Sequence, residues 1–116
     1  TYQASGTVFG KNMPRLICLG DYRTECYMDG ILLVFTHLDV PGIIGFVGKV
    51  LADEQVNIAQ MAVGRKGAAG SPAVGVLNLD NPASESAIQR VLENESIQSA
   101  KLIHLPAVGE LPDWLA

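Results

Sequence analysis

The fold is decided by the stretch from Gly30 to Arg65, which reads GILLVFTHLDVPGIIGFVGKVLADEQVNIAQMAVGR. Its opening residues alternate between two sets of side chains, which is the period of a half-buried β-strand. One set is Ile31, Leu33, Phe35 and His37, and the other is Leu32, Val34 and Thr36. The pattern predicts a strand over residues 31–37 that ends in the polar turn His-Leu-Asp-Val-Pro-Gly.

A helix should follow this turn, because the next apolar residues recur at helical spacing. They are Ile43, Phe46, Val47, Val50 and Leu51. Lys49 and Asp53 fall on the opposite face, and Pro41 suits the first helical turn, where its missing N–H costs nothing. Val-Asn-Ile-Ala then opens a second strand over residues 56–65.

The remaining chain predicts a second unit of the same kind. Residues 67–72 form a loop by composition, and a strand resumes over residues 73–80. Asn81-Pro82 should cap a second helix, and a last strand covers residues 97–105. The apolar stripe of that second helix is Ala87, Ile88, Val91 and Leu92.

The order β-α-β-β-α-β predicts an α+β fold, the ferredoxin-like sandwich, preceded by a short β-hairpin extension. Its antiparallel four-stranded sheet carries two helices on one face, and the other face stays uncovered unless something docks on it. An isolated sheet of this kind also has exposed edge strands, which are a liability in a monomer. We therefore expect a homodimer or a larger homo-oligomer, with the polar turns at a subunit boundary.

Upstream, residues 16–19 and 22–27 are predicted to pair as a hairpin across a tight turn at Gly20-Asp21. The expected register pairs Leu19 with Tyr22, Cys18 with Arg23, and Cys26 with Arg15. The two cysteines would then not be cross-strand neighbours. We expect reduced structural thiols, with no disulfide, no metal site and no thiol catalysis.

Composition bounds the class of protein. A chain of 116 residues, 48% of them hydrophobic, can bury one core. Charged residues make up 17%, below the usual ~25%, which indicates that a partner covers part of the surface. The net charge of −4 and the lack of a Lys/Arg cluster argue against nucleic acid or an anionic membrane as the main partner.

Targeting signals are absent from the sequence as given. No apolar run approaches the ~18 residues of a membrane span, and no signal peptide opens the chain, so we expect a cytoplasmic protein. The chain opens at Thr1 in strand-like sequence without a Met, so we expect a fragment of something longer. The tail over residues 107–116 should pack through Trp114 on the surface or on a neighbouring chain.

The polar residues around the first turn suit a small zwitterion. The first helical turn after Pro41 offers unpaired backbone N–H groups and the positive end of the helix dipole to a carboxylate. Asp39 could accept from an ammonium, and His37 could hydrogen-bond a hydroxyl or a carboxylate. Asn57 offers both a donor and an acceptor at the start of the second strand.

Each of these residues also has a structural interpretation. Asp39 could only stabilise the helix start, Asn57 could satisfy backbone groups at a junction, and His37 could be a hydrogen-bonded core histidine. No nucleophile, metal cage or phosphate cradle is evident, so a sensor is predicted and not a catalyst.

Residues 36–42, Thr-His-Leu-Asp-Val-Pro-Gly, with Val-Asn-Ile-Ala at 56–59, resemble the ACT domain, a small amino-acid-sensing module. Three further segments, Ser5–Gly10, Pro14–Ile17 and Gly20–Tyr22, resemble the closing strands of the intervening domain in the long-form D-3-phosphoglycerate dehydrogenase family. The resemblance divides the chain into the end of that intervening domain (1–29), an ACT domain (30–106) and a tail (107–116).

The resemblance implies a regulatory domain that binds L-serine or another small amino acid between ACT domains and controls serine biosynthesis by feedback. The implied effector contacts are His37, Asp39 and Asn57, together with the flanking Val40, Pro41, Gly42, Ile43 and Ile58. The family often has Asn at the position of Asp39. NAD and the catalytic site would belong to the parent enzyme and not to this segment.

Two alternatives stay open. An iron–sulfur L-serine dehydratase subunit carries a similar pair of modules and could be the parent. The chain could instead be an oligomerisation module without a ligand, in which His37, Asp39 and Asn57 are structural.

Overall fold

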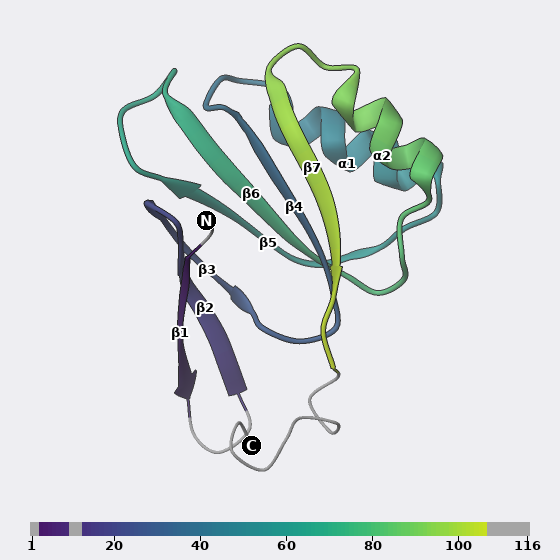
Figure 1. Cartoon of the computed structure of the whole chain (residues 1–116). Helices are drawn as coiled ribbons and strands as arrows, with labels where there is room; N and C mark the ends of the chain where they lie inside the picture. Colours follow the sequence, from purple (N-terminus) through teal and green to yellow (C-terminus); the bar gives the residue numbers. More distant parts are fainter. Residues whose placement is uncertain (1–2, 10–12, 107–116) are drawn as a thin grey trace.

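A computed structural model of the chain describes residues 3–9 and 13–106. In this part of the chain, seven strands form one curled antiparallel sheet, and two helices accompany it (Figure 1). The strand order across the sheet is β1-β2-β3-β5-β6-β4-β7. The elements are β1 (Ala4–Phe9), β2 (Met13–Leu19), β3 (Tyr22–Tyr27), β4 (Ile31–Leu38), α1 (Ile43–Asp53), β5 (Ile58–Arg65), β6 (Pro72–Leu79), α2 (Glu85–Leu92) and β7 (Ile97–His104).

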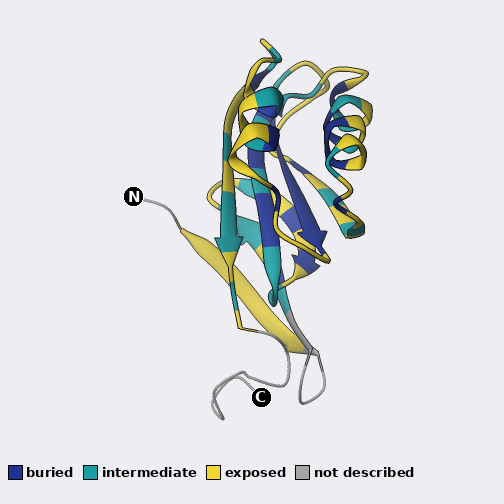
Figure 2. Cartoon of the chain, turned by 90° about the vertical axis from the view of Figure 1, so that its right-hand side faces the viewer, coloured by how far each residue is buried: buried dark blue, intermediate teal, exposed yellow. Residues whose placement is uncertain are grey.

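The predicted order β-α-β-β-α-β is confirmed from β4 to β7. Both helices lie on one face of the sheet, as the edge-on view in Figure 2 shows. Phe35 and Leu33 of β4 are fully buried against Val47 and Leu51 of α1 in the core between the layers. Gly75 on β6 belongs to this packing, since a Cβ there would lie 2.3 Å from the Phe35 ring.

The helix starts differ from the sequence prediction by a residue or more. Helix α1 begins at Ile43 with Gly42 as its N-cap, so Pro41 precedes the helix and is not in its first turn. Helix α2 is capped by Ser84, whose Oγ accepts from the Ala87 backbone N–H, and not by Asn81-Pro82. A serine side chain that accepts from the N–H three residues later is a strong N-cap, so the helix starts after Ser84 and not after the earlier asparagine.

The apolar stripe predicted for α2 is confirmed in part. Ala87 and Val91 are buried, and Ile88 packs against the same core from a partly buried position. Leu92, the last residue of α2, is exposed.

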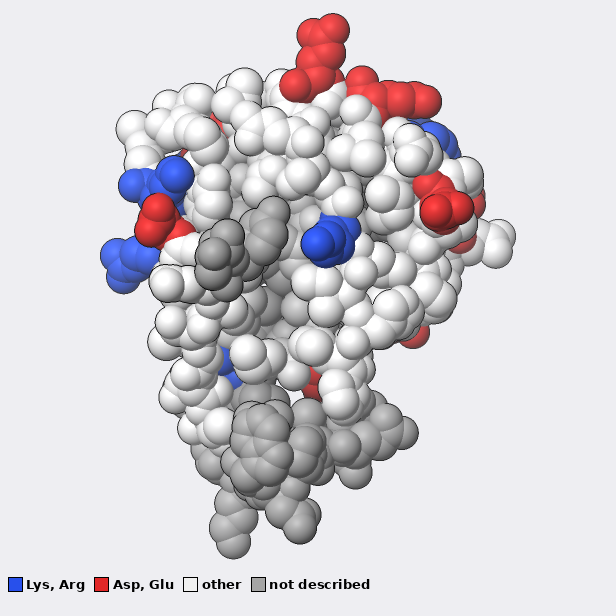
Figure 3. Space-filling view, in the orientation of Figure 1, with Lys and Arg blue, Asp and Glu red and all other residues white. Residues whose placement is uncertain are grey.

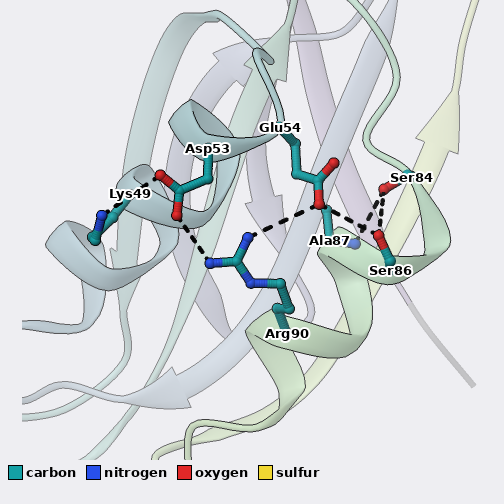
Figure 4. Close-up of polar contacts among 7 residues, drawn as sticks. All are labelled: Lys49, Asp53, Glu54, Ser84, Ser86, Ala87 and Arg90. Carbon is teal, nitrogen blue, oxygen red and sulfur yellow. Dashed lines mark hydrogen bonds and ion pairs between the residues drawn. The ribbon is translucent and has the colours of Figure 1, made fainter.

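An ion-pair network joins the two helices on their outer side (Figure 4). The Arg90 guanidinium of α2 donates to Asp53 of α1 at 3.0 Å and lies 3.9 Å from Glu54. Lys49 approaches the other oxygen of Asp53 at 3.5 Å. The hydrogen bond from Arg90, with the nearby charge of Lys49, holds the pKa of Asp53 below its usual value.

The upstream strands form a three-stranded meander, because β1 adds to the predicted hairpin. The pairs Leu19–Tyr22 and Cys18–Arg23 are confirmed. The pairing of Cys26 with Arg15 is wrong: a β-bulge between Leu16 and Cys18 shifts the register, so that Cys26 faces Leu16. A bulge inserts one residue into one strand and cannot be read from alternation alone. Both cysteines are free, as expected.

The second face of the sheet, expected to stay uncovered unless something docks on it, is covered by the meander. Leu16 and Cys26 of the meander pack on Leu32, Val74 and Val76 in a second apolar cluster. The Asn78 side chain links β6 to the end of β3. Its Nδ2 donates to the Tyr27 carbonyl at 2.9 Å, and its Oδ1 accepts from the Tyr27 N–H at 3.3 Å.

Strand β3 joins the main sheet at a single register pair, Arg23 with Arg65 of β5. Gly64 permits this contact, because a Cβ there would lie 2.6 Å from the Arg23 carbonyl oxygen. The predicted packing of Trp114 falls outside the described residues. None of the helices in the described part of the chain is long and apolar enough to cross a membrane.

Candidate effector-binding site

The candidate site begins with His37, which is 2% exposed at the end of β4. Its ring lies 5.2 Å from that of Phe35, on the helix-covered face of the sheet. Nδ1 lies 2.7 Å from the Leu38 carbonyl oxygen and must donate to it, since a carbonyl only accepts. Nε2 is buried without a partner. In the neutral ring this nitrogen is an acceptor.

Asp39 follows directly after β4 and pairs with Arg65 at the end of β5. The Arg65 Nε lies 2.5 Å from Oδ2 of Asp39. The backbone of Asp39 is fixed as well, because its N–H donates to the Ser71 carbonyl and its carbonyl accepts from the Gly70 N–H. The carboxylate is therefore held in place by both the loop and a cation.

The sheet register brings these groups to one end of the molecule. His37 pairs with Ala73 of β6, and Ala73 pairs with Arg65 of β5. These three residues form one row across the sheet, and neighbouring strands are about 4.8 Å apart. The alternation of β5 puts Arg65 on the face of Met61, which lines a depression together with Phe35. His37 and Arg65 thus lie on the same face, with the small Ala73 between them.

The turn between β4 and α1 is open to solvent at Val40, Pro41 and Gly42, whereas Ile43 is buried in the core. Gly42 has φ 93°, a left-handed conformation that glycine adopts without strain. No side chain caps the first N–H groups of α1, and no acidic residue lies in its first turn. This helix N-terminus is therefore free to attract an anion.

Asn57 and Ile58 lie at the other end of the sheet. Ile58 pairs with Leu79, which in turn pairs with Ile31 at the start of β4. Ile31 precedes His37 by six positions, about 20 Å at the rise of an extended strand. Asn57 is exposed there, and its Nδ2 donates to Asp80 at 2.6 Å. One chain by itself does not bring Asn57 to His37 and Asp39.

Between these two ends, α1 and β5 border a shallow, solvent-open apolar depression. It is lined by Phe35, Ile44, Val47, Gly48, Ile58, Met61 and Leu77. Met61 is 49% exposed and Val63 is 40% exposed. An added Cβ at Gly45 or Gly48 of α1 would meet nothing within 4 Å. This strip, which we call the α1–β5 face, is apolar and flat enough for another surface to approach closely.

Among the described residues, no group of three or more His, Cys, Asp or Glu side chains is arranged to hold a metal ion. Sequence reasoning missed Arg65 as a site residue. The sequence feature that could have pointed to Arg65 is its position at the end of the strand over residues 58–65, where alternation puts it on the same face as Met61 and Val63. The pairing with Asp39 depends on a contact between residues 26 positions apart, which no local pattern encodes.

No protein-family model matches the chain. Its sequence is similar to one class of enzyme, the D-3-phosphoglycerate dehydrogenases. The enzyme of Bacillus subtilis (strain 168) is 32% identical over 106 residues, which are 91% of this chain and 20% of the relative. That of Methanocaldococcus jannaschii is 36% identical over 94 residues, which are 81% of this chain and 18% of the relative.

A chloroplastic relative from Arabidopsis thaliana, D-3-phosphoglycerate dehydrogenase 3, is 28% identical over 95 residues. The chain spans about a fifth of the length of the Bacillus and Methanocaldococcus relatives. A match of this extent is consistent with a segment that lacks the catalytic site of those enzymes.

Proposed function

We propose that this chain is the C-terminal regulatory part of a D-3-phosphoglycerate dehydrogenase and contains a ferredoxin-like ACT domain that binds L-serine. Two findings support this proposal: the similarity to D-3-phosphoglycerate dehydrogenases over most of the chain, and the strand order β7-β4-β6-β5 with both helices on one face. All relatives named above are D-3-phosphoglycerate dehydrogenases, which favours this parent over a serine dehydratase subunit.

The single observation that carries the proposal is the unpartnered Nε2 of His37. A buried polar atom without a partner costs free energy, of the order of 1–3 kcal/mol, and such atoms are rare in folded proteins. A ligand hydroxyl donating to Nε2 would remove this cost. L-Serine has such a hydroxyl, and Asp39 next to the same strand end would accept from its ammonium.

The proposed site is shared between two copies of the chain. If two copies pair through the α1–β5 face about a two-fold axis, the same surface of each copy contacts the other in the opposite direction. The Asn57 end of one copy would then lie next to the His37 end of the other. The exposed Met61 and Val63 and the open space at Gly45 and Gly48 fit a second copy of this surface. The full site would then contain His37, Asp39 and the turn Val40–Ile43 of one copy with Asn57 and Ile58 of its partner.

In the parent enzyme, serine would act as the end product that slows a distant NAD-dependent active site. Such coupling requires serine to bind one arrangement of the assembly better than another. A segment that assembles but binds no ligand is the second candidate. The orphaned Nε2 of His37 disfavours it, because a purely structural histidine is normally satisfied on both sides.

Calorimetric titration with L-serine, glycine and the other amino acids tests the proposal, with sedimentation to follow the assembly. We expect saturable serine binding that is lost in His37→Ala and in Asn57→Asp. Folded, dimeric protein that binds no amino acid would overturn it.

The interface is tested with Gly48→Leu, which has room in the single chain but would obstruct the second copy. We expect this variant to sediment as a monomer. Lys49→Leu is the matched control, because it adds the same side chain on the exposed polar face of α1 and should remain dimeric.

A further inference from the structure

We infer that Arg65 is a ligand-binding residue of the effector site and holds the carboxylate of the amino acid, while its partner Asp39 holds the ammonium. The inference rests on the proposed function and adds to it a residue that neither the sequence patterns nor the family resemblance assigns. It makes the Asp39–Arg65 ion pair the element that recognises the charged groups of the ligand.

The geometry leaves Arg65 free to act in this way. Only Nε of its guanidinium contacts Asp39, and the side chain is 59% exposed. Neither Nη1 nor Nη2 makes a hydrogen bond or ion pair among the described residues. A guanidinium binds a carboxylate best through two parallel N–H groups, and the two Nη groups offer such a fork to solvent.

Asp39 keeps the guanidinium in place. Its side chain is only 15% exposed, and its backbone is fixed by hydrogen bonds to Gly70 and Ser71. An arginine anchored through Nε loses less side-chain freedom on binding than one that moves freely in solvent. The pair is therefore pre-organised before the ligand arrives.

The electrostatics also favour a zwitterion. An α-amino acid carries a positive and a negative group on the same carbon atom, and the ion pair presents a negative and a positive group side by side. Asp39 alone would add an uncompensated negative charge and would repel the carboxylate. Arg65 balances this negative charge, so that the pair is neutral overall and has a positive and a negative end. A charged aspartate can therefore bind the ligand at a position where a neutral asparagine could do the same.

Basic side chains gather on the same margin of the molecule. Figure 3 shows lysine and arginine side chains with acidic ones between them on that side, next to a largely uncharged face. Arg23 lies opposite Arg65 in the sheet, and the Lys66 ammonium sits 5.0 Å from the centre of the Tyr22 ring. Arg23 has no contact with Asp39 among the described residues, so it supplies a matched control for the charge of Arg65.

The experiment compares L-serine with L-serinamide, which keeps the ammonium and the hydroxyl but lacks the carboxylate. Binding of both is measured by calorimetry on the whole chain and on Arg65→Gln, Arg65→Lys and Arg23→Gln. We expect the wild-type chain to prefer serine by about ten- to hundredfold, the range of a charge-assisted hydrogen bond. Arg65→Gln should lose this preference through weaker serine binding, while its affinity for serinamide is retained or rises. Arg65→Lys should recover part of the preference, and Arg23→Gln should keep all of it.

Three results would overturn the inference. Arg65→Gln could keep the wild-type preference, which would assign the carboxylate to the helix N-terminus alone. Arg65→Gln and Arg23→Gln could lose it equally, which would reduce Arg65 to a long-range charge. Wild-type chain that binds neither compound would contradict the proposed function itself, and this result differs from the other two. Thermal unfolding of each variant shows that a lost affinity is not a lost fold.

Discussion

At the residue scale, burial has its clearest effect on the ionisation of the Cys26 thiol. Its thiol is fully enclosed between the meander and the sheet, and burial raises its pKa to about 11, against the lowering effect of the nearby Arg15. The folded state therefore favours the neutral thiol over the thiolate. The resulting stabilisation is complete below the ordinary thiol pKa of 9.0 and is lost as the pH rises from there to about 11.

We predict that the free energy of unfolding falls more steeply between about pH 8 and pH 10.5 in the wild-type chain than in Cys26→Ala. The expected excess is about 2 kcal/mol, because one unit of pKa corresponds to about 1.4 kcal/mol and most of the rise from 9.0 to about 11 has taken effect by that pH. Urea unfolding at both pH values measures it. Cys18→Ala is the control and should follow the wild type. Parallel curves for wild type and Cys26→Ala would contradict this explanation.

Some residues of the site could be predicted from the sequence, and others could not. His37 and Asp39 stand out because the alternation of a single strand ends at them. The burial of His37 and the partner of Asp39 depend on β5 and β6, which are distant in sequence. The distance between His37 and Asn57 arises because β4 and β5 run parallel on either side of β6, so that the end of β4 and the start of β5 lie at opposite ends of the sheet.

At the scale of elements, the side chain of Asn78 is one of the contacts that hold the meander to the main sheet. It is buried on β6 and makes two hydrogen bonds with the backbone of Tyr27. Replacing it with leucine removes the donor to the part-buried Tyr27 carbonyl, at a cost of about 0.5–1.5 kcal/mol. We predict that Asn78→Leu speeds hydrogen exchange in β3 and leaves exchange in β4 and β6 nearly unchanged.

Gln60→Ala is the control for Asn78, because the Gln60 Oε1 also accepts from the Tyr27 N–H but leaves the Asn78 contacts intact. Its exchange pattern should stay close to that of the wild type. A uniform acceleration over the whole chain in Asn78→Leu would show a general loss of stability, and the role of Asn78 as a local fastening would then be wrong.

The elements themselves were well predicted where the apolar period was long. The strands β4 to β7 and both helices follow from alternation and helical spacing within single segments. The docking of the meander on the second sheet face was missed, since it depends on an apolar cluster that joins Cys26 to Val74 and Val76, which no local pattern specifies. The Gly20-Asp21 turn was visible, but the bulge beside Cys18 that sets the register was not.

At the scale of the whole molecule, the residues of the candidate site fall into two groups at opposite ends of the sheet. His37, Asp39 and Arg65 lie at one end, and Asn57 lies at the other. The α1–β5 face runs between them, with exposed Met61 and Val63 in its middle. The proposed two-fold pairing of this face would complete two equal sites, each made from both copies, and would bury the apolar strip at the same time.

The most direct test of this account is a complementation experiment. His37→Ala and Asn57→Ala are each expected to abolish serine binding when they are pure. After the two are mixed in equal amounts and allowed to exchange subunits, half of the dimers are mixed, and each of these has one intact site. We predict that about a quarter of the wild-type serine-binding capacity returns, with wild-type affinity. No recovery, in a mixture shown to contain mixed dimers, would contradict the central claim that two chains share the site.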